Sequence, residues 1–79
     1  MTSVYVIKSE IRNYIYVGLT DDLERRVQQH RSGQNRTTKA YKPFRLVHTE
    51  AFNSREEARV REKFLKSGSG KEWIKRTLC

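Results

Sequence analysis

The chain has 79 residues, which is room for one small domain, and we expect residues 1–79 to form a single unit with a modest core. A hydrophobic share of 35%, with three Phe, four Tyr and one Trp, favours a globular domain over a disordered tail. Seventeen Lys and Arg against nine Asp and Glu give a net charge of +8, which favours polyanionic partners, with nucleic acid as the first candidate.

Several other classes of protein are disfavoured. Cys79 is the only cysteine, so no disulfide can form within the chain and no cysteine cluster can hold zinc. The N-terminus lacks the apolar run of a signal peptide, and no stretch approaches the roughly 20 apolar residues that cross a bilayer. Basic residues are not concentrated opposite an apolar stripe either. We therefore expect a cytoplasmic protein with no membrane partner.

The N-terminal part predicts a β-hairpin. Residues 3–8 and 14–19 are rich in β-branched and aromatic side chains, and a polar stretch separates them. In the second strand, the period of two places both tyrosines and Gly18 on one face, with Ile15 and Val17 on the other. One face of this strand is therefore aromatic and the other aliphatic.

A helix is predicted over residues 22–31. Asp21 and Glu24 have the spacing of a capping box, which marks its start. Arg26 and His30 stand at positions i and i+4, so we expect them one turn apart on the same face of this helix.

A basic loop and a third strand follow. Residues 32–43 lack apolar periodicity, which predicts a mobile, solvent-facing loop. Residues 44–52 alternate, which predicts a strand. The face predicted to be shared in this strand comprises Leu46, His48, Glu50 and Phe52. We assign His48 to packing, because no metal-ligand partner stands at a useful spacing.

The C-terminal part predicts two helices. Ser54 with Glu57 forms a capping box for a helix that ends near Lys66, and Val60 and Phe64 widen its apolar face. A Ser-Gly-Ser-Gly segment then breaks this helix.

After that break, Ser69 with Glu72 predicts the start of a short final helix. The expected order is strand, strand, helix, strand, helix, helix. This order predicts an α/β fold of the α+β type, with a small three-stranded, mainly antiparallel sheet flanked by helices.

These segments resemble the GIY-YIG nuclease family. Its two name-giving tripeptides read Ser3-Val4-Tyr5 and Tyr16-Val17-Gly18 here, residues 20–30 look like its Leu-x-x-Arg-x-x-x-His helix, and Arg61-Glu62-Lys63 looks like its glutamate helix. The resemblance covers nearly the whole chain and is greatest to the small stand-alone bacterial members, which are related to the N-terminal module of the excision-repair incision subunit. It implies cleavage of DNA phosphodiesters with Mg²⁺ or Mn²⁺. Since larger members carry separate DNA-binding domains, it also implies a separate targeting protein.

The catalytic set implied by the resemblance is Tyr5, Tyr16, Arg26, His30 and Glu62. Glu62 offers a hard oxygen ligand, and Mg²⁺ or Mn²⁺ commonly needs only one or two protein carboxylates. Arg26 can clamp the scissile phosphate through its fork of donors. Tyr5 can orient or deprotonate the attacking water, and Tyr16 can donate to a phosphate oxygen. His30 can relay a proton because its unperturbed pKa is about 6.5.

Substrate contacts are expected from Gly18 and the basic loop. Gly18 faces the same way as Tyr16 and leaves space where a side chain would block the substrate backbone. The loop residues that could follow a phosphate backbone are Arg36, Lys39 and Lys42, together with Tyr41. The alternative is a loop that is merely solvated.

Other functions remain open. No asparagine follows Asn53, whereas many active members of the family carry one near the metal site. This departure supports a second hypothesis, a non-catalytic nucleic-acid-binding module with a degenerate nuclease site. A third is a protein-interaction module whose charge is incidental. For Glu62, the structural alternative to metal binding is an ion pair with Lys66 at i, i+4.

Overall fold

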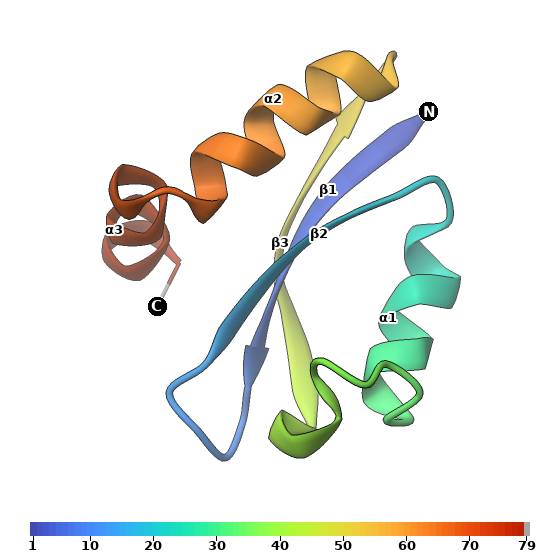
Figure 1. The fold of residues 1–79 in the computed structure, drawn as a ribbon, viewed down its shortest axis with the longest axis vertical. Coiled ribbons are helices and arrows are strands. Elements are labelled where there is room, and N and C mark those ends of the chain that lie inside the picture. The colour runs from blue at the N-terminus through green and yellow to red at the C-terminus, as the bar shows by residue number, and fades with distance from the viewer. Residues whose placement is uncertain (79) are drawn as a thin grey trace.

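A computed structural model describes residues 1–78 as an antiparallel sheet with helices on both faces (Figure 1). The elements of this part are β1 (Thr2–Ser9), β2 (Ile15–Thr20), α1 (Leu23–Arg31), a 3₁₀ turn η1 (Lys39–Tyr41), β3 (Phe44–Phe52), α2 (Arg55–Lys66) and α3 (Gly68–Thr77). The α+β class and the predicted order of strands and α-helices are both confirmed.

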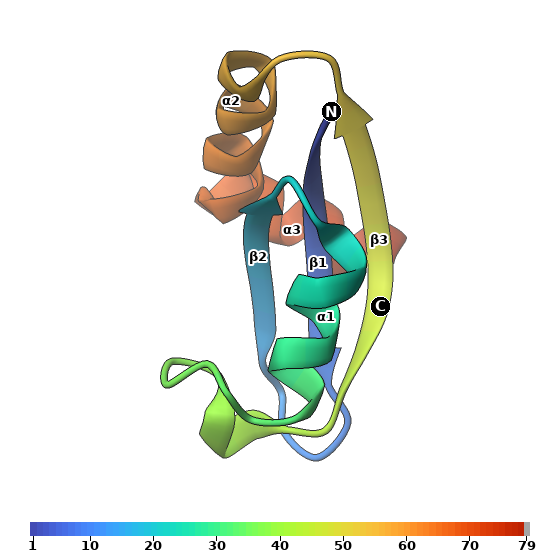
Figure 2. The same cartoon turned by 90° about the vertical axis from the view of Figure 1, so that its right-hand side faces the viewer.

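The sheet has the order β2-β1-β3, so β1 is central and pairs antiparallel with both neighbours. Figure 2 shows α1 in front of the sheet, with α2 and α3 behind it. In the same view β2 and β3 form the two edges. The β2 edge is therefore flanked by α1 on one side and by α2 and α3 on the other.

Each face of the sheet has its own apolar cluster. The cluster on the α2 and α3 side is aliphatic and is centred on the buried residues Val4, Val6, Val17, Ala58, Leu65 and Ile74. The cluster on the α1 side is mainly aromatic and joins Tyr5, Ile7 and Phe44 to the partly buried Tyr14, Tyr16, Leu23 and Tyr41. The predicted division of β2 into an aromatic and an aliphatic face is confirmed, since Ile15 packs with the first cluster.

The start of α1 differs by one residue from the prediction. The side chain of Asp22, and not that of Asp21, accepts a hydrogen bond of 3.2 Å from the backbone N–H of Arg25. Asp21 accepts a hydrogen bond of 2.7 Å from the Thr2 hydroxyl and pairs with Arg55 at 3.1 Å. Asp21 therefore ties the ends of β1 and β2 to α2, and its neighbour caps the helix.

The second cap is confirmed and the third was placed wrongly. Ser54 accepts a hydrogen bond from the backbone N–H of Glu57, as predicted. For α3, however, Ser67 and not Ser69 is the N-cap, and its hydroxyl accepts a 3.2 Å hydrogen bond from the N–H of Gly70. Because Ser67 follows α2 directly, the two helices are joined by a single residue, and Ser69 lies inside the first turn of α3.

The strict alternation predicted for β3 was wrong. Two successive residues of β1 face His48 and Leu46, so Val47 is an extra residue that forms a β-bulge. Leu46 consequently lies on the α1 side, where it shares a surface hollow with Val27. His48 remains on the opposite side and contacts the Trp73 ring edge-on at 5.6 Å between centroids. At the bulge, the alternation of side chains between the two faces of the sheet shifts by one residue.

The basic segment 32–43 is not the free loop that its composition predicted. Thr38 is fully buried, and η1 follows it directly. The ring of Tyr41 stacks on the ring of Tyr14 with centroids 3.8 Å apart. These contacts anchor the second half of the segment against the aromatic cluster.

Helix α2 has a narrower apolar face than predicted. Val60 is 71% exposed and Phe64 is 39% exposed, while Ala58 and Leu65 are fully buried.

Within residues 1–78, no helix has both the length and the apolar character needed to cross a membrane.

Candidate active site

Tyr5 lies at the centre of the site, and Gly18 allows it to be there. The two residues face each other across β1 and β2, and Tyr5 is 1% exposed. A Cβ built on Gly18 would overlap the Tyr5 ring and hydroxyl, because the phenol lies directly over the glycine. Gly18 therefore makes room for Tyr5, whereas the sequence analysis expected it to make room for the substrate. The hydroxyl is held above the edge strand.

His30 connects Tyr5 to the basic segment. A hydrogen bond of 2.8 Å joins the Tyr5 hydroxyl to His30 Nε2, and another of 2.8 Å joins His30 Nδ1 to the Thr38 hydroxyl. His30 and Thr38 are both fully buried. The Tyr16 ring lies 4.9 Å from the His30 ring and 6.2 Å from the Tyr5 ring, between centroids. The three residues form one chain of hydrogen-bonded groups, with Tyr16 beside it.

Burial and nearby charges keep this chain neutral. Burial raises the pKa of Tyr5 far above the ordinary value, Tyr16 adds to the rise, Arg26 opposes it and Glu62 adds a smaller increase. Burial also lowers the pKa of His30, and the Arg26 guanidinium lowers it further. A protonated phenol and a neutral imidazole are therefore the resting forms near neutral pH.

The charged residues Arg26 and Glu62 approach Tyr5 from opposite layers of the fold. Arg26 comes from α1 and is exposed, and Glu62 comes from α2 with a side chain that is 14% exposed. Arg26 lowers the pKa of Tyr5 and Glu62 raises it, so charges from both layers act on the same phenol. Lys66 Nζ donates to Glu62 Oε2 at 3.1 Å, which is the i, i+4 ion pair expected as the structural alternative.

The donor set for a metal ion is small. Among residues 1–78, no group of three His, Cys, Asp or Glu side chains is placed to hold a metal. Glu62 is the carboxylate whose charge acts on Tyr5, and a single carboxylate fits Mg²⁺, which keeps several waters and takes further oxygens from a substrate phosphate. The residues therefore suit a hard cation bound together with its substrate, and not a tight pre-formed cage.

The predicted substrate-binding lysines and arginine do not join this cluster. Arg36, Lys39 and Lys42 are exposed on the segment between α1 and β3. They lie on the same segment as Thr38, whose side chain binds His30. A role for them in phosphate binding stays a prediction.

The sequence of the whole domain matches a known family. Residues 1–76 match the family described as the GIY-YIG catalytic domain. The chain belongs to the GIY-YIG family. The two tyrosine strands are β1 and β2. The helix with the arginine and the histidine is α1, and the helix with the glutamate is α2.

Relatives of this GIY-YIG domain occur in archaea and bacteria. A UPF0213 protein of Halobacterium salinarum is 43% identical over 63 residues, which are 78% of this chain and 80% of that protein. A UPF0213 protein of Staphylococcus saprophyticus is 33% identical over 73 residues, covering 91% and 88%. The solution NMR structure of a UPF0213 protein from Bacillus halodurans has a TM-score of 0.58 and 38% identity, covering 96% of this chain and 84% of that one. The chain therefore matches most of the length of each of these proteins.

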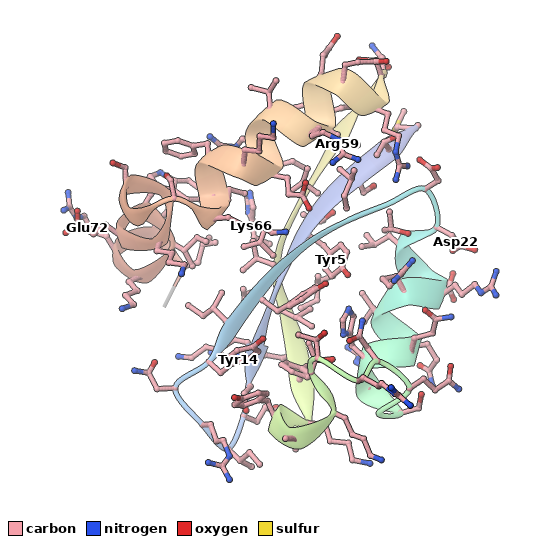
Figure 3. The ribbon with its side chains drawn as sticks, in the orientation of Figure 1. Tyr5, Tyr14, Asp22, Arg59, Lys66 and Glu72 are labelled. Carbon is pink, nitrogen blue, oxygen red and sulfur yellow. The ribbon has the colours of Figure 1, made fainter. Side chains whose placement is uncertain are left out.

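Three residues at the GIY-YIG site were not among the predicted site residues. Nothing in the sequence indicated that Thr38 would be buried beside His30, because its segment lacks apolar periodicity. Arg59 and Lys66 stand at i−3 and i+4 from Glu62, so they share its face of α2. Figure 3 shows both side chains extending from α2 on the side of Tyr5. Their spacing from the predicted glutamate was the signal that could have identified them.

Proposed function

We propose that this domain is a divalent-metal-dependent endonuclease that hydrolyses phosphodiester bonds in DNA. The observation that supports it is the buried hydrogen bond between the Tyr5 phenol and the His30 imidazole, together with the charges of Arg26 and Glu62 that both act on this phenol. Phosphodiester hydrolysis requires a positioned water, a path for its proton and positive charge near the phosphate. Each requirement has a residue among these four.

In this proposal Tyr5 and His30 remove the proton from water together. The pKa of Tyr5 is too high for a standing phenolate, so the phenol must lose its proton as it gains one. The water proton moves to the Tyr5 oxygen while the Tyr5 proton moves to His30 Nε2, 2.8 Å away. For this transfer, the resting proton of His30 is on Nδ1, and this N–H donates a hydrogen bond to the Thr38 hydroxyl. Thr38 thereby positions the imidazole.

The charged residues act on the phosphate. Arg26 is exposed on α1 and binds the non-bridging oxygens through its parallel N–H donors. The Tyr16 hydroxyl orients the same group. Glu62 would hold Mg²⁺ or Mn²⁺, and the bound ion would supply Lewis-acid stabilisation of the developing negative charge. Lys66 must then leave the carboxylate with which it is paired.

The decisive experiment compares two glutamate substitutions. Labelled branched, single-stranded and duplex DNA are incubated with Mg²⁺ or Mn²⁺ and with the wild type, Glu62→Gln or Glu72→Gln. Glu72 lies at the far end of the molecule on α3 and is exposed (Figure 3), so it is a matched carboxylate outside the site. We expect cleavage by the wild type and Glu72→Gln, and a loss of roughly a hundredfold or more with Glu62→Gln.

A second candidate is a nucleic-acid-binding module without catalysis. The absence of any asparagine after Asn53 supports it, together with the net charge of +8. Salt-sensitive binding to all three DNA forms, with no product in either metal, would favour this candidate. The absence of binding at about 50 mM salt would argue against both and favour a protein-interaction role.

A further inference from the structure

A groove runs along the β2 edge next to the candidate active site. It has a volume of about 460 Å³ and lies between β2 and the helices α2 and α3. Ile15 of β2 supplies partly exposed apolar surface, whereas Val17 of β2 and Ile74 of α3 line the groove as members of the buried aliphatic cluster. The hydrolytic residues do not account for this hollow.

Three lysines line the groove. Lys66 comes from the end of α2, and Lys71 and Lys75 are one turn apart on α3. The described residues that line the groove include no aspartate or glutamate. Like charges at i, i+4 repel each other, so Lys71 gains no stabilising ion pair from Lys75 along α3. The groove therefore combines an apolar lining with unbalanced positive charge.

Two residues connect the groove to the catalytic cluster. Tyr16 lines the groove and also lies 4.9 Å, between ring centroids, from His30. Lys66 lines the groove and is paired with Glu62 at 3.1 Å. A phosphate that leaves the groove at this end arrives directly beside Glu62.

We propose that this groove binds a single nucleic-acid strand, next to the phosphate that is cleaved. This inference rests on the proposed function, because it defines where the substrate strand continues beyond the site. The lysines bind successive phosphates, and the apolar surface contacts sugar or base edges. If Glu62 held a metal ion, Lys66 would be free of its ion pair with Glu62 and would contact the strand together with the other two lysines.

The dimensions and lining favour one strand over a duplex. Cavities of roughly 300–1,000 Å³ enclose one ligand of about nucleotide size, and a duplex is far wider. A duplex also keeps its bases stacked inside, where they cannot reach an apolar surface. A positively charged groove with an apolar lining is typical of proteins that follow a single strand. The substrate class is therefore DNA with a flap or another unpaired strand at the site of cleavage.

The test measures binding without cleavage. Fluorescence anisotropy follows a labelled oligothymidine of about 10 nucleotides and a duplex of the same length, in EDTA, over a range of salt concentrations. Lys71→Gln/Lys75→Gln is compared with Lys63→Gln/Arg76→Gln, which removes the same charge from exposed residues outside the groove. We expect the groove variant to bind the single strand roughly tenfold more weakly at about 50 mM salt, with a salt slope smaller by about 1.4.

The control variant should stay within about twofold of the wild type, since Lys63 and Arg76 do not line the groove and therefore contact no phosphate of the bound strand. Equal losses in the two variants would overturn the proposal, because they would reflect net charge alone. A larger loss for the duplex than for the single strand would also overturn it, as would unchanged binding. Because no metal is present, these results do not depend on catalysis. Cleavage that survives Glu62→Gln would instead refute the proposed function.

Discussion

The substitution Gly18→Ala tests the central contact of the site, the packing of the Tyr5 phenol over the edge strand. The new methyl group would occupy the space of the Tyr5 ring, so either the ring or the strand must move. Overpacking of this kind costs about 1–3 kcal/mol, and the intrinsic gain from replacing glycine by alanine offsets about 0.4–1 kcal/mol of it. If Tyr5 also loses His30, a buried polar group left without its partner adds about 1–3 kcal/mol. We therefore expect the free energy of unfolding of Gly18→Ala to be about 2 kcal/mol lower than that of the wild type.

The matched control is Gly68→Ala, because a Cβ at Gly68 meets no atom within 4 Å. Urea unfolding, followed by the fluorescence of Trp73, should show Gly18→Ala destabilised and Gly68→Ala unchanged or slightly stabilised. For a domain of this size, the expected loss corresponds to a decrease in Tm of roughly 8–16 °C. Cleavage should fall with Gly18→Ala and persist with Gly68→Ala.

A double-mutant cycle separates this contact from a general effect on the strand. In a Tyr5→Ala background the ring is absent, so Gly18→Ala should cost little or nothing. A coupling energy below about 0.5 kcal/mol would refute the reasoning, because it would mean that the methyl group acts on something other than Tyr5. Equal stability of Gly18→Ala and Gly68→Ala would refute it as well.

Two further predictions follow from buried polar contacts. Thr38→Val should cost about 1–3 kcal/mol in urea unfolding and slow cleavage, because His30 Nδ1 loses its partner, whereas Thr38→Ser should retain both properties. Burial raises the pKa of Glu50, but hydrogen bonds from Arg61 and His48 outweigh burial and hold the pKa below the ordinary 4.5. A depressed carboxyl pKa stabilises the fold above the ordinary value, so the stability advantage of the wild type over Glu50→Gln should shrink as pH falls below 4.5. A constant advantage across that range would contradict the assignment.

Much of the fold could be predicted because local patterns and tertiary packing agree. The alternation in β2 predicted which side chains share the face of Tyr16, and the spacing in α1 predicted that Arg26 and His30 share a face. Both patterns rest on fixed periods of the backbone. The face of β2 and the face of α1 that carry the candidate residues could therefore be predicted from the sequence without knowing any tertiary contact.

The errors have physical causes of their own. Ser67 and Ser69 both precede a helical pattern, and spacing alone could not show that α3 starts directly after α2. The bulge at Val47 depends on pairing with β1, which a single-strand pattern does not contain. Thr38 stands in a segment without periodicity, so its burial against His30 is a tertiary fact. Each error concerns a contact between segments that are distant in the sequence or a boundary between two elements.

The position of Tyr5 beside an edge strand explains how so small a domain can assemble this site. Arg26 and Glu62 belong to helices on opposite faces of the sheet, so the sheet itself lies between these two layers. At an interior strand, two such side chains would be screened from each other by neighbouring strands. At β2, which has no strand beyond it in the described part of the chain, the charges of both residues act on the same phenol. In the proposed function, the edge that usually invites pairing with another strand would be the place where residues from both layers contact one phosphate.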